Sequence, residues 1–277
     1  MMHKTVRVFV LAGSLAALAL PAMAQEHGAP QPPRLKWSFA GPFGKFDQAQ
    51  LQRGFKIYKE VCASCHSIEL LAFRNLAESG GPGYSAAQAE ALAGEYKIKD
   101  GPNDQGEMFE RAGRPADRFP PPFANDQAAR AANGGVLPPD MSVLAKARTF
   151  ERGFPWFVFD MVTQYQEQGP DYIAALLKGY GEKPKDLQLP AGAHYNSYFP
   201  GHAIGMPAPL QDGQVTFDDG APTTLDQYAK DVSAFLMWAA EPHLVARKRL
   251  GFQVMFFLLV LAGLLYFTKK KVWADAH

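Results

Sequence analysis

The pentapeptide Cys62-Ala63-Ser64-Cys65-His66 constrains this 277-residue chain most, because it contains the only two cysteines. Two thiols at this spacing share one helical turn and can add to the two vinyl groups of a single porphyrin, whose iron the adjacent His66 can then bind. A redox disulfide would also use both cysteines, but it needs no adjacent histidine, and no strand–helix–strand pattern surrounds the motif. The motif therefore predicts one covalently attached haem c.

The beginning of the chain has the pattern of a secretory signal peptide. Lys4 and Arg7 precede an apolar run that is closed by Pro21, and Ala22-Met23-Ala24 forms a small-x-small cleavage site. The run is short for a membrane-spanning helix. Export agrees with the haem motif, since covalent attachment needs reduced thiols delivered outside the cytoplasm.

A second apolar run, residues 250–268, contains no charged residue and approaches the length of about 20 residues that a spanning helix needs. Basic triplets flank it on both sides, so charge alone leaves its orientation open, and the signal peptide places the bulk of the chain outside. We therefore expect a signal peptide over 1–24, an exported c-type haem domain over 25–246, a transmembrane anchor helix over 247–268 and a cytoplasmic tail over 269–277. This predicts a single-pass protein of the inner (cytoplasmic) membrane with its haem domain in the periplasm.

The expected exported domain is acidic, with 20 Lys and Arg against 26 Asp and Glu over residues 25–246. That balance argues against a nucleic-acid partner and favours a basic one. Glu78–Asp117 holds eight of the acids and four bases. It is a candidate docking face, although a merely solvated loop has the same composition.

Two helices are expected to form the core. One begins at Asp47, carries Leu51, Phe55 and Tyr58 on one face and delivers the haem motif at its end. Gly54 within it predicts a close helix crossing, although a tolerated surface glycine would also fit the pattern. The other begins at Thr224 and stops before Pro242. Packed across each other, they predict a mainly α, loop-rich c-type cytochrome domain with a single C-terminal transmembrane helix.

The remaining segments give weaker signals. Asp140 is expected to cap a helix that carries Arg148, and the aromatic stretch 154–165 is expected in the core. Further expectations are helices over 85–96, 125–132 and 171–180, mostly irregular chain over 97–125, no regular element over 198–210, and a short strand and turn over 215–220.

A low-spin electron carrier needs a second axial ligand on its iron, commonly methionine. Of the nine methionines, Met206 lies in a loop rich in proline and glycine, which can hold a thioether against iron. Met108 and Met141 have less distinctive settings. His202 is the rival, because a His/His site would also be low-spin.

Five ordered segments together are similar to the cytochrome c1 family, the haem subunit of the quinol–cytochrome c oxidoreductase, in its bacterial form. They are RGFKIYKEVCASCHS (53–67), DGPN (100–103), AANGGVLPPDMS (131–142), YFPGHAIGMP (198–207) and AAEP (239–242). The resemblance covers nearly the whole chain after the signal peptide. Two departures are a longer segment over 149–170 than in the mitochondrial relatives, and the lack of cysteines for the additional disulfide of some bacterial ones.

The resemblance implies thioether bonds at Cys62 and Cys65, and axial ligation by His66 and Met206. It also implies that Arg148, Asn133 and Tyr172 lie near the haem propionates. An electron carrier is implied that takes single electrons from a Rieske iron–sulfur subunit and passes them to a basic, soluble or tethered cytochrome c. Cytochrome b would be a further partner, in a dimeric, proton-translocating complex of respiration or photosynthesis.

Two other functions compete with electron transfer. A catalytic haem enzyme, such as a peroxidase, needs an open sixth position and a distal acid/base pair, and the sequence offers no clear pair. A haem sensor needs an output domain, for which residues 269–277 leave no room.

Overall fold

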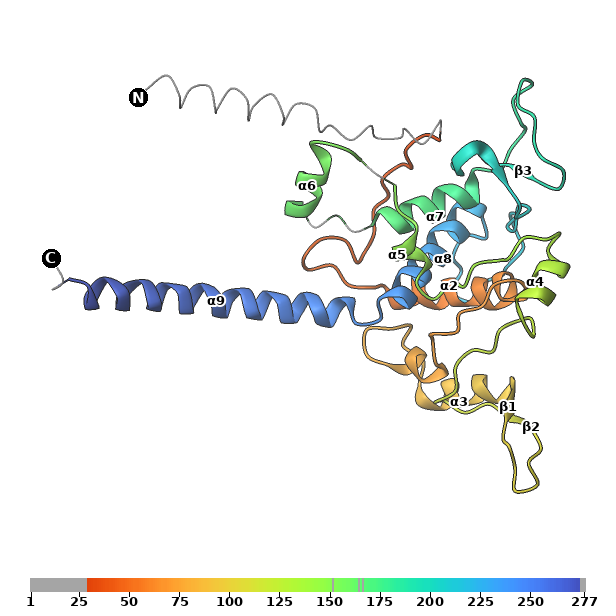
Figure 1. The fold of residues 1–277 in the computed structure, drawn as a ribbon, viewed down its shortest axis with the longest axis horizontal. Coiled ribbons are helices and arrows are strands. Elements are labelled where there is room, and N and C mark those ends of the chain that lie inside the picture. The colour runs from red at the N-terminus through yellow and green to blue at the C-terminus, as the bar shows by residue number, and fades with distance from the viewer. Residues whose placement is uncertain (1–28, 151, 164, 166, 275–277) are drawn as a thin grey trace, which may run out of the picture.

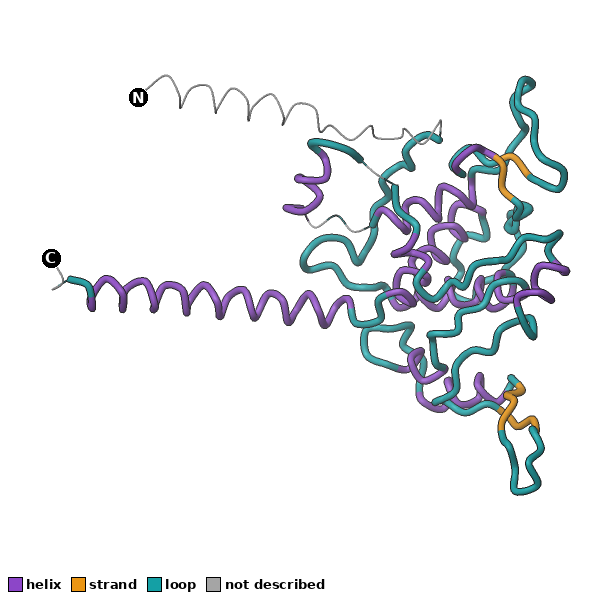
Figure 2. Tube along the Cα trace, in the orientation of Figure 1, coloured by secondary structure: helices purple, strands orange, loops and turns teal. Residues whose placement is uncertain are grey.

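A computed structural model describes residues 29–150, 152–163, 165 and 167–274. The expected signal peptide and residues 275–277 lie outside them. The described chain is mainly helical and rich in loops, and one long helix leaves the domain (Figures 1 and 2). The elements are α2 (Gln48–Glu60), η1 (Cys62–Ser64), η2 (Phe73–Ala77), α3 (Ala86–Gly94), β1 (Lys97–Asp100), β2 (Phe109–Ala112), α4 (Asp126–Ala132), α5 (Leu144–Ala147), α6 (Trp156–Thr163), α7 (Gln168–Lys178), β3 (His194–Tyr195), η3 (Pro200–His202), β4 (Ala203–Ile204), α8 (Leu225–Ala240) and α9 (Leu244–Val272).

Helix α2 begins where the sequence predicts. The Asp47 carboxylate accepts the Gln50 backbone N–H at 2.7 Å, which satisfies one of the free donors of the first turn. Leu51, Phe55 and Tyr58 are buried on one face, as expected. The α-helix ends at Glu60, and the chain tightens into the 3₁₀ turn η1, so the haem motif starts a new local structure directly after α2.

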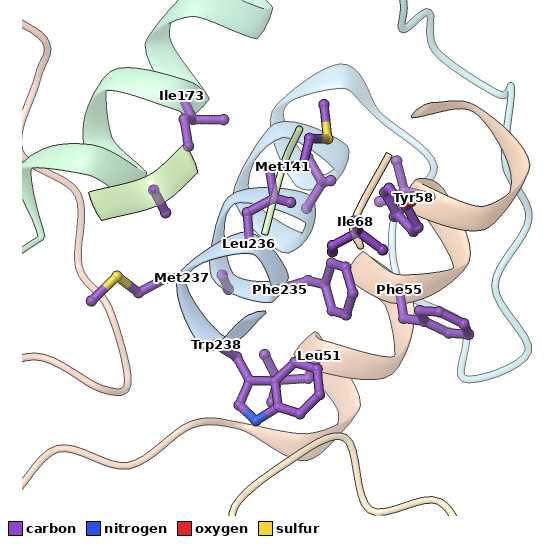
Figure 3. Packing of buried hydrophobic residues seen from close by; sticks show 14 of the residues in the cluster. Leu51, Phe55, Tyr58, Ile68, Met141, Ile173, Phe235, Leu236, Met237 and Trp238 are labelled. Carbon is purple, nitrogen blue, oxygen red and sulfur yellow. The ribbon is translucent and has the colours of Figure 1, made fainter. Parts of the chain in front are cut away.

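Helix α8 crosses α2 at Gly54, as the glycine predicts. A Cβ atom added there would lie 2.2 Å from the Asp231 carbonyl oxygen of α8, so no larger residue fits this crossing. Phe235 of α8 then packs between α2 side chains, with ring centroids 5.6 Å from Phe55 and 5.8 Å from Tyr58 (Figure 3). The close approach compensates for the helix propensity of glycine, which is about 1 kcal/mol worse than that of alanine.

A buried carboxylate fixes the rotation of α2 against α8. Asp231 accepts hydrogen bonds from Gln50 at 3.1 Å, from the Arg53 Nε at 2.6 Å and from Gln227 at 2.9 Å. An unpaired charge in this interface would be strongly unfavourable, so the three donors belong to the packing itself.

Helix α9 is the helix of the described chain that is long and apolar enough to cross a membrane, and its apolar window has no buried residue. Of all its residues only Leu244, at its start, is buried. The prediction of an apolar spanning helix is therefore confirmed, with helical structure extending beyond 247–268 at both ends.

Residues 97–125 are mostly irregular, as expected, but β1 and β2 within them form an antiparallel hairpin in which Lys97 pairs with Ala112. Arg111 of β2 forms ion pairs with Asp100 and Asp117, a side-chain bracing that composition does not reveal. The strand expected over 215–220 is absent, whereas the expected turn is present at 218–219. The Val215 backbone N–H donates to the Tyr228 hydroxyl at 3.0 Å, so a side chain replaces the expected strand partner.

Two further predictions are wrong. Asp140 does not cap the helix that precedes Arg148; α5 begins after Val143, and the Asp140 carboxylate binds other donors. The aromatic stretch 154–165 is mostly outside the core, because the side chains of Phe154 and of residues 156–159 are exposed. Apolar composition therefore did not indicate burial here.

Candidate haem site

Both cysteines of the motif lie in one turn. The Cys65 and His66 N–H groups donate to the Cys62 carbonyl at 3.1 and 2.9 Å, so the chain folds back on itself directly after α2. Both cysteines are half-buried residues with free thiols, and no disulfide joins them. The turn thus presents two thiols and the following imidazole from one short segment, as attachment to one porphyrin requires.

The environment of Cys62 opposes a redox role. Burial raises the pKa of the Cys62 thiol to about 12, and the neighbouring Cys65 raises it further. Redox-active Cys-x-x-Cys motifs work in the opposite way, since they lower a cysteine pKa to obtain the thiolate. The local electrostatics therefore disfavour disulfide exchange.

The His66 imidazole is buried and fixed in one tautomer. Its Nδ1 lies 2.8 Å from the Pro139 carbonyl oxygen. A carbonyl oxygen can only accept, so Nδ1 carries the hydrogen and Nε2 keeps its lone pair. Burial lowers the pKa of His66, and the Pro139 bond and the Asp140 charge oppose this only in part. A neutral imidazole whose second nitrogen bonds a backbone carbonyl is the usual form of a metal-bound histidine.

The loop that carries Pro139 is braced against the residues after His66. The Asp140 carboxylate accepts the Ser67 hydroxyl at 2.8 Å and the Glu69 N–H at 2.9 Å. The Met141 N–H donates to the Ser67 carbonyl at 2.8 Å. Burial acts to raise the pKa of Asp140, but these bonds and those from Ser142 hold it below its usual value. The carbonyl that orients His66 therefore sits on a rigid support.

Met206 lies half-buried just after η3 and the two-residue strand β4. Strand β4 pairs with β3, with Ala203 opposite Tyr195. The Tyr180 hydroxyl donates to the Met206 carbonyl at 3.1 Å. The loop is thus held to the segment after α7, although it contains almost no regular structure of its own.

One loop, residues 133–140, contacts His66 and Gly205, the residue before Met206. Pro139 bonds His66, and Val136 packs against Gly205, where an added Cβ would lie 2.8 Å from Val136 Cγ2. The structure therefore brings the His66 and Met206 segments to the same loop, although they are far apart in the sequence.

His202, the rival ligand, makes the same kind of hydrogen bond as His66 and likewise keeps its Nε2 free. Its Nδ1 lies 3.2 Å from the Asn196 carbonyl oxygen, and its ring centroid lies 5.8 Å from that of Tyr195. Among the other methionines, Met108 is exposed in the loop just before β2, and Met141 is buried in the hydrophobic core. Met206 remains the methionine whose loop packs toward the His66 support.

The three propionate candidates are placed differently. Tyr172, on α7, is half-buried beside Tyr180 and contributes to its raised pKa, which burial mainly causes. Asn133 ends α4, and its amide donates to the Ala129 carbonyl at 2.7 Å. Arg148 is exposed at the end of α5. Over the described residues, no hydrogen bond joins Arg148 or Asn133 to His66 or Met206.

Sequence reasoning missed three supporting groups: the Pro139 carbonyl, the Asp140 carboxylate and the Tyr180 hydroxyl. The Pro139 carbonyl could not be recognised because its partner His66 lies 73 positions earlier in the chain. Tyr180 carried no signal, because a tyrosine near a helix end is common in any core.

The donor set fits a covalently bound haem. Two thiols and a neutral imidazole with a free Nε2 come from one turn, and the thioether loop packs against the same support. When bound, the haem would supply a one-electron iron centre.

Comparison with known proteins agrees with this chemistry. Residues 37–276 match the model of the cytochrome C1 family. The chain is 66% identical over 269 residues to a cytochrome b/c1 of Bradyrhizobium diazoefficiens. These residues make up 97% of this chain but only 39% of the relative, so the chain spans less than half the length of that protein. It is 51% identical to a cytochrome c1 of Blastochloris viridis, covering 94% of this chain and 92% of the relative. It is 45% identical to one of Rhodospirillum rubrum, covering 97% of both chains.

The fold, the exposed apolar helix α9 and these matches lead to one assignment. The chain belongs to the cytochrome c1 family, the c-type electron-transfer subunits of the cytochrome bc1 complex, and is a membrane-anchored cytochrome with covalently attached haem.

Proposed function

We propose that this chain is the electron carrier that receives single electrons from a Rieske iron–sulfur subunit and passes them to a cytochrome c. The two thiols of Cys62 and Cys65 would hold the haem through thioether bonds, and His66 and Met206 would be the axial ligands. The observation that carries the proposal is the His66 tautomer, whose Nδ1–H donates to Pro139 and leaves Nε2 for iron.

The residues around the iron would keep it six-coordinate and perform no bond-making reaction. A catalytic haem enzyme needs an open sixth position with an acid and a base beside it. Here the Met206 backbone is tied by Tyr180, and its neighbour Gly205 is packed against Val136, which supports a filled position. Arg148, Asn133 and Tyr172 stay candidates for the haem propionates, since a guanidinium, an amide and a hydroxyl all suit carboxylates.

The partners follow from the family and from one relative. A relative whose name combines cytochrome b and c1 in one protein supports a neighbouring cytochrome b subunit. The complex would be a dimeric, proton-translocating quinol–cytochrome c oxidoreductase. With the signal peptide removed, the haem domain would face the periplasm, and the C-terminus would face the cytoplasm.

The assembly is tested by purifying a tagged full-length chain from its own membranes in a mild detergent. A b-type haem spectrum and the electron paramagnetic resonance signal of a Rieske cluster should co-elute with the c-type haem. A chain that elutes with haem c as its sole redox group, from membranes that contain the other two signals, would contradict the proposed assembly.

The acidic segment Glu78–Asp117 supports a basic acceptor, and the ion pairs within it leave only some of its acids available for docking. Arg111 neutralises Asp100 and Asp117, and Lys59 pairs with Glu95 at 2.6 Å. Four further acids of the segment are exposed: Glu90 on α3, Asp104 and Glu107 in the loop between β1 and β2, and Glu110 on β2, which lies 4.0 Å from Lys97. In Figure 1 this hairpin lies at the end of the domain away from α9, where a soluble protein has free access.

Electron transfer to a basic cytochrome c should therefore slow as salt is added, because the Debye length shortens to about 8 Å at roughly 0.15 M. The double variant Asp104→Asn with Glu107→Gln should flatten this salt dependence in stopped-flow kinetics. Glu182→Gln, also exposed but outside the segment, is the matched control. Equal salt slopes for the double variant and the native chain would exclude the hairpin as the docking face.

A further inference from the structure

Helix α6 displays the densest group of exposed apolar side chains outside α9. Phe154, just before it, is 82% exposed, and residues 156–159 are between 39% and 55% exposed. Outside α9 and the adjoining Trp273, the described chain has only six other large apolar side chains that are exposed, and these are scattered over five segments. Patches of this kind mark binding surfaces.

The exposed side chains point to all sides of the helix. Trp156, Phe157, Val158 and Phe159 are consecutive, and at 3.6 residues per turn four consecutive positions surround the helix axis. A helix that docks on a protein surface usually exposes one apolar face and keeps a polar one. The first turn of α6 therefore fits an apolar solvent better than a partner's groove.

The polar groups of this segment lie where it joins the domain. The Arg152 guanidinium pairs with Asp160 at 2.5 Å and lies 5.1 Å above the Trp156 ring. It also lies 5.3 Å from the Tyr165 ring, and the Tyr165 hydroxyl donates to the buried Asp171. The exposed apolar residues of α6 are thus held to the domain by contacts of the charged and polar residues beside them.

Asp171 also links these polar groups to the beginning of the described chain. It accepts the Trp37 Nε1–H at 2.8 Å and the Leu35 N–H at 3.0 Å. The position of α6 is therefore fixed to the segment 34–37 as well as to α7. In Figure 1 that early segment runs between α6 and the start of α9.

Helix α6 lies on the side of the domain from which α9 departs, level with the first turns of α9 along the long axis of the molecule (Figures 1 and 2). The loop around Phe43 reaches the same level. Its ring is 75% exposed and lies 5.9 Å from the ring of Phe252, in the first apolar turns of α9. The apolar surface of α9 thus continues onto the domain.

The first described segment carries a charge opposite to that of the whole domain. Residues 29–46 contain Arg34, Lys36 and Lys45 and no acid, and all three are exposed. Arginine and lysine beside exposed aromatic rings are the composition of elements that lie in the headgroup region of a membrane.

We propose that α6 inserts its aromatic side chains into the outer interface of the bilayer that α9 crosses, and that the basic segment 29–46 contacts its anionic headgroups. The chain then has two membrane contacts, a spanning helix and an interfacial one. Together they set the orientation of the haem domain relative to the membrane plane.

The test uses the full-length, haem-loaded chain, whose native cysteines are occupied by the haem, so a nitroxide label reacts only with an introduced cysteine. Phe157→Cys reports on α6, and Met108→Cys is the control, since Met108 is 64% exposed on the hairpin loop away from α9. Both go into nanodiscs of phosphatidylcholine and phosphatidylglycerol, and power saturation compares collisions with oxygen and with a water-soluble nickel chelate.

The label at 157 should collide several-fold more with oxygen than with the chelate, and the label at 108 should show the reverse. Equal chelate accessibility at both positions would overturn the proposal. Shielding of position 157 from both reagents would overturn it too, because it would indicate a protein contact in place of lipid. Phe159→Cys gives a second reading should Phe157→Cys lose its haem spectrum, and replacing phosphatidylglycerol with phosphatidylcholine should reduce the oxygen preference.

Discussion

His66 follows the two cysteines directly, whereas Met206 lies far along the chain in a loop with almost no regular structure. The proposed histidine side is secured by the thioether positions at 62 and 65, by the Pro139 carbonyl and by the Asp140 brace. The methionine side has one hydrogen bond from Tyr180 and one close packing contact at Gly205.

The difference teaches which changes should alter the iron and which should alter only the fold. The histidine side is covalent, so damage to its support should appear as lower stability with ligation intact. The methionine side is held by weak contacts, so small changes there should appear as altered ligation. Reduction potential and carbon monoxide binding report on ligation, and chemical unfolding reports on stability.

The largest change in potential is expected for Met206→Leu. Haem should stay attached, while loss of the sulfur donor lowers the reduction potential and opens the iron to carbon monoxide. A shift of roughly 200 mV would change the electron-transfer equilibrium more than a thousandfold, since about 59 mV is a factor of ten for one electron. Potentiometric titration and carbon monoxide difference spectra measure both effects. His202→Gln is the control and should change little; loss of the low-spin spectrum there, with Met206→Leu unaffected, would assign the ligand to His202.

A partial loss of ligation is expected for Gly205→Ala. The new Cβ would meet Val136 Cγ2 at 2.8 Å, and a branched valine cannot move its methyl group aside easily. Overpacking costs about 1–3 kcal/mol, so the population without the thioether should rise by about five- to 150-fold. Carbon monoxide titration measures this population. Adding Val136→Ala should restore ligation, and a double variant no better than the single one would show that this contact does not position Met206.

A still smaller effect is expected for Tyr180→Phe, which removes the donor to the Met206 carbonyl. A net hydrogen bond is worth about 0.5–1.5 kcal/mol, so methionine ligation should weaken by about two- to tenfold. The absorbance band of the iron–sulfur bond, followed during mild heating, reports when the ligand leaves. Tyr195→Phe, on the neighbouring strand β3, serves as the comparison. Identical curves for the two variants would remove Tyr180 from the support of the loop.

No change in potential is expected for Asp140→Ala, although it removes the brace of the histidine side. The Ser67 hydroxyl and the Glu69 N–H would lose their acceptor, and we expect the free energy of unfolding to fall by about 2 kcal/mol. Denaturant titration followed at the main haem absorbance band measures it, with the exposed Asp186→Ala as control. A shifted potential would mean that the covalent bonds do not suffice to hold His66.

The local structure on the histidine side was predictable from the sequence because its information is local. Five consecutive residues predict the attachment, and Asp47 and Gly54 indicated where the preceding helix starts and where another helix crosses it. Met206 was reached through loop composition and the family resemblance. The supports at Asp140 and Tyr180 were not predictable, since their partners lie far away in the sequence and a carboxylate before a helix has the same pattern as a cap.

Apolar composition predicted burial unevenly. Helix α8 is buried as expected, and α9 was recognised by its length and its flanking charges. The aromatic stretch at α6 was assigned to the core because sequence shows that a side chain is apolar and not what covers it. Its exposure became visible only in the tertiary structure.

The junction between α8 and α9 has a mechanical consequence. Only Glu241, Pro242 and His243 separate the two helices, and Glu241 forms ion pairs with Lys146 of α5 and Arg247 of α9. Lys248 of α9 also donates to the Phe39 and Gly41 carbonyls at 2.6 and 2.5 Å. These contacts make the junction rigid and fix the orientation of the haem domain relative to α9. Where electron exchange needs motion, that motion would therefore belong to the partner protein and not to this junction.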